Sequence, residues 1–174
     1  KDAVKIYLND PNSPSNYWGD ISDWDVSKVT DFSRLFTSST NDDHIFGDGG
    51  PMIYSEFNED ISSWDVSSGI NFNKMFEGVQ TFNQDIGNWD VSSGIDFGGM
   101  FKGALSFNQD IGNWDVSSGI NFNNMFSSSP FNQDIGNWDV SSGIDFGYMF
   151  WNSSFNEDIG NWDVSSGVNF NEMF

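Results

Sequence analysis

Apolar and polar residues alternate around each tryptophan of a recurring Trp-Asp-Val tripeptide. In residues 88–92, Asn-Trp-Asp-Val-Ser, the apolar side chains stand at every second position. This is the period of a half-buried strand. We therefore expect Trp89 and Val91 to face a core while the polar residues around them face outward.

A second period follows the first. Phe72, Met75 and Phe76 are spaced i, i+3, i+4, which is typical of one face of a helix. Each unit is therefore predicted to contain a short strand, a turn, a short helix or 3₁₀ segment, and a loop. One such unit is too short to bury its own apolar face, whereas stacked copies would share a core of Phe, Trp and Met columns.

The unit repeats along most of the chain. Successive copies are 40, 25, 25, 24 and 24 residues apart, and the long first step holds an insertion between Phe36 and Phe57. The copies are marked by Trp24, Trp64, Trp89, Trp114, Trp138 and Trp162. The sequence thus predicts a solenoid of six 24–25-residue strand–turn–short helix repeats.

The charge of the chain is strongly negative and unevenly distributed. It has 26 acidic and 6 basic residues, a formal net charge of −20, and no Lys or Arg after Lys102. Nucleic acid is excluded as a partner because its binding depends on Lys and Arg contacts to phosphates, and anionic membranes are disfavoured for the same reason. The chain has no cysteine, and no apolar run approaches the roughly 18 residues of a membrane span.

One column of the predicted stack alternates between Asp and Asn. Asp96, Asn121, Asp145 and Asn169 occupy the same position in successive repeats. Alternation halves the number of like charges in the column, although duplication of a two-repeat block would leave the same pattern.

A resemblance to a known family rests on two motifs. Residues 24–36, Trp-Asp-Val-Ser-Lys-Val-Thr-Asp-Phe-Ser-Arg-Leu-Phe, and the later Phe-Asn-Gln-Asp-Ile units resemble the BspA-like leucine-rich-repeat surface proteins, also called DUF285 repeats. The resemblance implies an α/β fold, a right-handed leucine-rich-repeat-like solenoid, a surface location and adhesive or interaction roles. It also implies a helical N-terminal cap over residues 1–17 and one continuous repeat domain over residues 18–174, in which residues 37–56 contain the inserted loop.

Two aspartates recur in every repeat, one four residues before the tryptophan and one directly after it. Two interpretations are open. Each carboxylate caps a turn by accepting backbone N–H bonds, or carboxylates of adjacent repeats form oxygen-rich Ca²⁺ sites. The candidate Ca²⁺ ligands are Asp85, Asp90, Asp110, Asp115, Asp134, Asp139, Asp158 and Asp163.

Partner contacts are expected in two irregular places. The inserted loop is expected to project from a regular array and is therefore a candidate for partner contact. Its histidine lies beside two acids and either binds a divalent metal or is solvated. Trp151 lies outside the Trp-Asp-Val positions and either contacts a protein or sugar or covers the edge of the core. The candidate residues of the insertion are Asp42, Asp43, His44 and Asp48.

Catalysis is not expected from this sequence. A catalytic carboxyl pair needs two distinct environments in a water-excluding cleft, whereas every repeat offers nearly the same one. We expect a non-enzymatic extracellular or cell-surface protein that presents an acidic surface for adhesion or for binding a protein or glycan. The alternative is a structural segment of an extracellular filament or coat, self-associated end to end and dependent on Ca²⁺. The last repeat stops short at Phe174, so we expect more repeats or another chain to follow.

The two interpretations of the aspartates predict different responses to calcium. If they hold Ca²⁺ in the folded state alone, a ligand concentration of one hundred times Kd raises the free energy of unfolding by about 2.7 kcal/mol. Thermal melts in excess EDTA, in millimolar CaCl₂ and in MgCl₂ measure this. A rise in Tm with calcium but not with magnesium supports the metal sites, and identical melts in EDTA and calcium leave the aspartates as turn caps.

Overall fold

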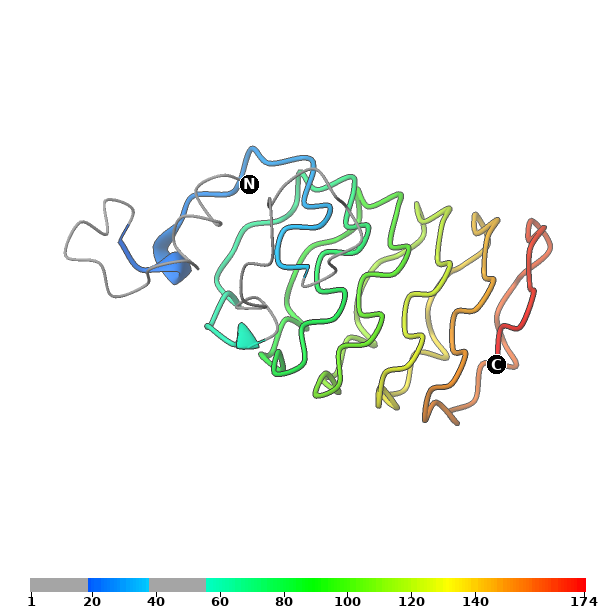
Figure 1. The fold of residues 1–174 in the computed structure, drawn as a ribbon. Helices are drawn as coiled ribbons and strands as arrows, with labels where there is room; N and C mark the ends of the chain where they lie inside the picture. Colours follow the sequence, from blue (N-terminus) through cyan, green and yellow to red (C-terminus); the bar gives the residue numbers. More distant parts are fainter. Residues whose placement is uncertain (1–18, 38–55) are drawn as a thin grey trace, which may run out of the picture.

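The computed structural model describes residues 19–37 and 56–174. The chain winds through successive coils that stack into one elongated body, from the blue segment to the red C-terminal segment (Figure 1). Each coil is one sequence repeat and is called a rung here. Rungs 1 to 6 are those of Trp24, Trp64, Trp89, Trp114, Trp138 and Trp162. The predicted N-terminal cap, residues 1–17, lies outside the described residues.

A short ladder of backbone hydrogen bonds joins each rung to the next. The main-chain N–H groups of Phe72, Lys74 and Phe76 donate to carbonyl oxygens of rung 3 over 2.8, 2.9 and 2.9 Å, and Ile95 donates back to Ile70 over 2.8 Å. The equivalent residues of later rungs form the same bonds. Isolated parallel bridges mark this register through Asp31, Asn71, Asp96, Asn121, Asp145 and Asn169. Every residue of the ladder therefore lies over its own counterpart in the neighbouring repeat.

The fold class predicted from the sequence is wrong. In the described ranges, the one element with defined bounds is the 3₁₀ helix η1 (Ile21–Asp23), and the pairs between rungs are isolated bridges rather than strands. The rungs consist of turns and irregular backbone. The structure is therefore not an α/β, right-handed leucine-rich-repeat-like solenoid of strand–turn–short helix units with a helical cap.

The predicted strand is missing because two tight turns enclose the Trp-Asp-Val segment. In rung 2 the N–H of Trp64 donates to Ile61 O over 3.1 Å, and the N–H of Gly69 donates to Val66 O over 2.7 Å. Only a few extended residues fit between these turns. The inward and outward alternation itself is confirmed, since Trp89 and Val91 are buried while Asp90 is exposed.

The predicted helix is missing because each rung turns through a left-handed residue. Met75 N–H donates to Phe72 O over 3.1 Å, as in a single turn, but Lys74 has φ 57°, which a right-handed helix excludes. The next N–H, of Phe76, is used by rung 3. The same left-handed position recurs at Arg34, Gly99, Asn124, Tyr148 and Glu172. The i, i+3, i+4 spacing therefore corresponds to a tight corner of the backbone, which places three apolar side chains in the core.

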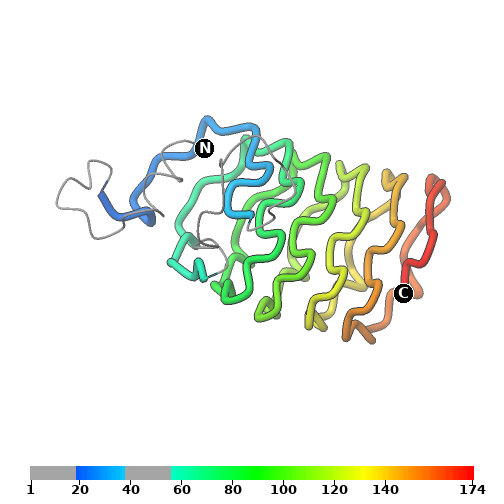
Figure 2. Tube along the Cα trace, viewed as in Figure 1, coloured from blue at the N-terminus to red at the C-terminus, as the bar shows by residue number. Residues whose placement is uncertain are grey.

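Phenylalanine rings form three continuous columns through the core, as the sequence predicted for the core residues. Around Phe101, the ring centroids of Phe76 and Phe126 in the adjacent rungs lie at 5.6 and 5.8 Å, and that of Phe107 lies at 3.9 Å. The columns comprise Phe32, Phe72, Phe97, Phe122, Phe146 and Phe170; Phe36, Phe76, Phe101, Phe126, Phe150 and Phe174; and Phe57, Phe82, Phe107, Phe131 and Phe155. Figure 2 shows the successive coils that carry them following nearly the same path.

Each tryptophan from rung 2 onward ties its rung to the preceding one. Trp114 Nε1 donates to Ile86 O over 3.0 Å, and Trp138 Nε1 donates to Ile111 O over 3.1 Å. Each of these carbonyls already accepts the N–H of its own turn, as Ile86 O does from Trp89 over 3.1 Å, so the indole adds a second, buried hydrogen bond that joins the two rungs.

Truncation of one core ring tests the stacked core. Phe101→Ala removes a fully buried ring between two others and is expected to lower the free energy of unfolding by about 3–5 kcal/mol. Phe174, at the same position of rung 6, is 69% exposed, so Phe174→Ala should cost less than about 1 kcal/mol. Urea denaturation of both variants measures the difference, and equal losses would contradict the described packing.

Candidate functional site

Two columns of aspartates line the stack. The first aspartate column comprises Asp20, Asp60, Asp85, Asp110, Asp134 and Asp158, and the second comprises Asp25, Asp65, Asp90, Asp115, Asp139 and Asp163. Each carboxylate accepts the main-chain N–H two residues further on, as in Asp110 with Gly112 at 2.9 Å and Asp115 with Ser117 at 3.0 Å. This is an Asx turn. The turn-capping interpretation of the aspartates is confirmed.

The second column is held by serine as well as by backbone. Ser117 Oγ donates to Asp115 Oδ1 over 2.6 Å. The serine two residues after the aspartate lowers the pKa of the carboxyl, most through its hydroxyl and next through its N–H. This holds for five members of the second column, Asp25, Asp65, Asp115, Asp139 and Asp163. Partial desolvation of Asp115, and then the carboxylate of Asp139 on the next rung, oppose this by raising the pKa of Asp115. Neighbouring carboxylates thus repel, yet the serine donors favour the ionised form of these five aspartates.

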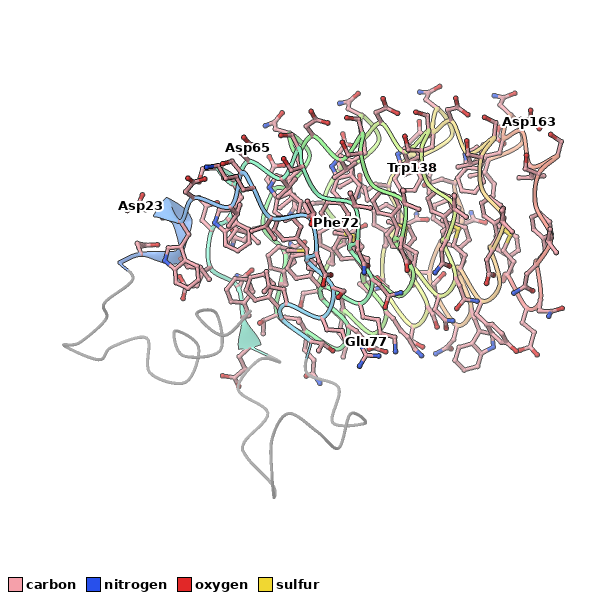
Figure 3. All side chains as sticks on the ribbon, turned by 90° about the horizontal axis from the view of Figure 1, so that it is seen from above. Asp23, Asp65, Phe72, Glu77, Trp138 and Asp163 are labelled. Atoms are coloured by element: carbon pink, nitrogen blue, oxygen red, sulfur yellow. The ribbon has the colours of Figure 1, made fainter. Side chains whose placement is uncertain are left out.

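The second aspartate column and the ion pairs of Glu77 lie on different edges of the stack. Asp65 and Asp163 lie along one edge, and Glu77 lies along the opposite edge (Figure 3). Glu77 pairs with Lys74 Nζ at 3.4 Å and with Lys102 Nζ at 3.9 Å. Since the sequence has no Lys or Arg after Lys102, the exposed aspartates of the two columns in rungs 4 to 6 have no basic residues in their own rungs.

The calcium interpretation stays a prediction. Over residues 19–37 and 56–174, no group of three His, Cys, Asp or Glu side chains is placed to hold a metal ion. The predicted ligands, from Asp85 and Asp90 in rung 3 to Asp158 and Asp163 in rung 6, lie instead in repeated single turns.

A third column alternates Asp with Asn, and the structure gives the physical reason. Asp96 Oδ1 accepts Gly98 N–H at 2.9 Å, Asn121 Nδ2 from rung 4 at 2.8 Å and Asn73 Nδ2 from rung 2 at 3.2 Å. Asp145 repeats the arrangement in rung 5. Amide donors from both neighbouring rungs therefore replace what would otherwise be stacked carboxylates. The alternation runs through Asp31, Asn71, Asp96, Asn121, Asp145 and Asn169.

In rungs 3 and 5 a glycine lies two residues after the aspartate because the amides need its space. A Cβ at Gly98 would lie 2.6 Å from Asn121 Nδ2 and 2.9 Å from Asn73 Nδ2. An asparagine side chain at the same position, such as Asn123 in the next rung, fits where the neighbouring rungs have glycine. The repeating unit of this column is consequently a pair of rungs.

The other predicted contact residues are separated from these columns in the sequence. Asp42, Asp43, His44 and Asp48 of the insertion lie outside the described residues. Trp151 is 43% exposed in the loop after Phe150, so it covers the core only in part, and its role in partner binding stays a prediction.

Sequence reasoning missed an exposed apolar column. Ile70, Ile95, Ile120 and Ile144 are 44%, 42%, 39% and 42% exposed, and Val168 continues the column in rung 6. The signal was present in the Ser-Ser-Gly-Ile segments, where an isoleucine follows a turn and precedes the Asp/Asn column. We call Ile70, Ile95, Ile120, Ile144 and Val168 the isoleucine column.

The fold defines a class: a tandem-repeat protein whose rungs stack like upon like through a backbone ladder. A family model described as "Mycoplasma protein of unknown function, DUF285" matches residues 12–130 and 117–174. The chain belongs to this family. Comparison with curated proteins found no match, and comparison with solved structures found none. Among the described residues, no helix is long and apolar enough to cross a membrane.

The Asp/Asn column predicts the effect of adding one carboxylate. Asn121→Asp removes the donor to Asp96 and places three carboxylates in successive rungs, so the free energy of unfolding at pH 7 should fall by about 1–3 kcal/mol. Asn113→Asp adds the same charge at an exposed position and should cost less than about 0.5 kcal/mol.

Urea denaturation at pH 7 and at a pH below about 4, the usual carboxyl range, separates the two effects. Once protonated, the carboxyl group that Asn121→Asp introduces can donate a hydrogen bond, so the deficit should shrink at acid pH. An Asn121→Asp variant as stable as Asn113→Asp at pH 7 would contradict the role of the amides.

Proposed function

We propose that this protein is a non-enzymatic extracellular or cell-surface repeat protein whose acidic columns bind a basic protein partner in adhesion. The observation that carries the proposal is the pair of aspartate columns, which recur on every rung while the chain has no Lys or Arg after Lys102. A surface of one charge sign raises the local concentration of the opposite charge and speeds association. A partner rich in Lys and Arg meets this surface.

The aspartates are suited to binding because their positions are fixed before a partner arrives. Asp115 is held by two donors from Ser117, and an ionised carboxylate has about four acceptor sites. Half of its acceptor capacity therefore remains for an Arg or Lys of a partner. Ordering the side chain beforehand reduces the entropy lost on binding.

The regular spacing supports an extended contact rather than catalysis. The turn around the second-column aspartate is nearly the same in rungs 3, 4 and 5, where the Asp–Ser N distances are 3.1, 3.0 and 3.0 Å. Repeated equal contacts add up along a surface, as in multivalent binding. Catalysis instead requires carboxyls held in different environments.

Binding of poly-L-lysine measures the predicted charge recognition. Asp90→Asn, Asp115→Asn and Asp139→Asn in one variant keep an oxygen that accepts the turn N–H but remove three charges. We expect its affinity for poly-L-lysine to fall about tenfold at low salt, from three exposed ion pairs of about 0.2–1 kcal/mol each. Fluorescence anisotropy in about 50 and about 500 mM NaCl should show salt-sensitive binding.

The matched control replaces three exposed serines of the same turns. Ser93→Ala, Ser118→Ala and Ser142→Ala change no charge and leave the donors to the aspartates in place, so affinity should stay within about twofold. Wild-type affinity in the asparagine variant, with its thermal melt unchanged, would refute the proposed role of the second column.

A further inference from the structure

We infer that the isoleucine column is a docking surface for an amphipathic, Lys- and Arg-rich α-helix of the partner, lying along the stack. This rests on the proposed function and specifies its partner. The column is exposed in every rung from 2 to 6, whereas the Phe, Trp and Met positions of rungs 2 to 5 are buried. A large exposed side chain repeated in register is a continuous apolar stripe, which typically marks an interaction site.

The backbone ladder fixes the stripe. Ile95 N–H donates to Ile70 O over 2.8 Å, Ile120 N–H to Ile95 O over 2.9 Å, and Ile144 N–H to Ile120 O over 2.9 Å. The isoleucines are therefore carried by the residues that join the rungs and cannot shift relative to one another. A β-branched side chain also has few rotamers to lose on contact. The stripe is ordered before a partner binds.

The spacing of the column favours a helix over an extended segment. Rungs joined by such hydrogen bonds are about 4.8 Å apart, so the four junctions from rung 2 to rung 6 span about 19 Å. A helix presents one residue of a stripe about every 5.4 Å, or about 22 Å over four turns. A strand presents same-side residues about every 6.8 Å, or about 27 Å over four intervals. Only the helix stays close to register over the whole column.

The acidic residues near the stripe in the sequence favour basic residues on the helix. Asp96 and Asp145 directly follow Ile95 and Ile144, and each second-column aspartate precedes its isoleucine by five residues across the Ser-Ser-Gly turn. A second copy of this chain would bring its own net charge of −20 against these carboxylates, which is unfavourable. A partner helix with an apolar stripe between two rows of basic residues can pack on the isoleucines and pair with the acids.

Two peptides of equal composition test the inference. Both have about 18 residues, enough to span the column as a helix, and consist of Leu and Lys. One carries its leucines as a single helical stripe, and the other distributes them around the helix. We expect wild-type protein to bind the striped peptide about tenfold more tightly, since only this peptide buries leucine against the column. Equal affinities would overturn the docking site while leaving charge recognition intact.

The matched variant is Ile95→Thr, Ile120→Thr and Ile144→Thr, because Thr30 naturally occupies this position in rung 1. It should bind both peptides with the lower affinity, and Leu105→Ser, which changes a 56% exposed residue off the column, should retain the preference. The aspartate variant should bind both peptides more weakly and keep their ratio.

Sedimentation velocity distinguishes a partner helix from a second copy. We expect wild-type protein to sediment as a monomer at the concentrations used for binding. A wild-type dimer that the threonine variant converts to monomer would overturn the inference and assign the column to self-association. An undiminished preference of the threonine variant for the striped peptide would also overturn it.

Discussion

The register of the backbone ladder is the constraint on which the other features depend. Because the N–H groups of Phe72, Lys74 and Phe76 reach carbonyls of the next rung, each residue lies over its own counterpart. Identical stacking is favourable for phenylalanine, whose rings attract one another, and unfavourable for aspartate, whose charges repel. The same register therefore builds the core without further adjustment and creates an electrostatic problem at every acidic position.

The acidic columns meet this problem in two ways. In the first and second aspartate columns the carboxylates stay at the surface, where water screens them, and each takes the N–H of its own turn, as Asp115 does from Ser117. In the partly buried third column screening is weaker, and asparagine amides intervene, as Asn121 does for Asp96. The degree of burial thus decides whether a column tolerates a charge on every rung or on every second rung.

The sequence predicted the contents of the columns better than the path of the backbone. The repeat length, the inward Trp89 and Val91, and the turn-capping aspartates could be read from periodicity and residue chemistry. The strand and helix could not, because the i, i+3, i+4 spacing of Phe72, Met75 and Phe76 fits a helix and a left-handed corner equally well. A positive φ at Lys74 is not encoded by residue type. The isoleucine column was missed because residue type alone does not distinguish an exposed isoleucine from a core isoleucine. The path of the backbone is needed to tell them apart.

The pairing of rungs through the third column has a consequence for how the array changes length. Removing one repeat, for example that of Asn121, would place Asp96 directly under Asp145, with no amide between them and with Gly98 under Gly147. Removing two repeats restores the sequence of partners. An array of this kind is therefore expected to gain or lose repeats in pairs. Loss of a single repeat leaves two stacked carboxylates in the third column, and their repulsion disfavours an array changed by an odd number of repeats.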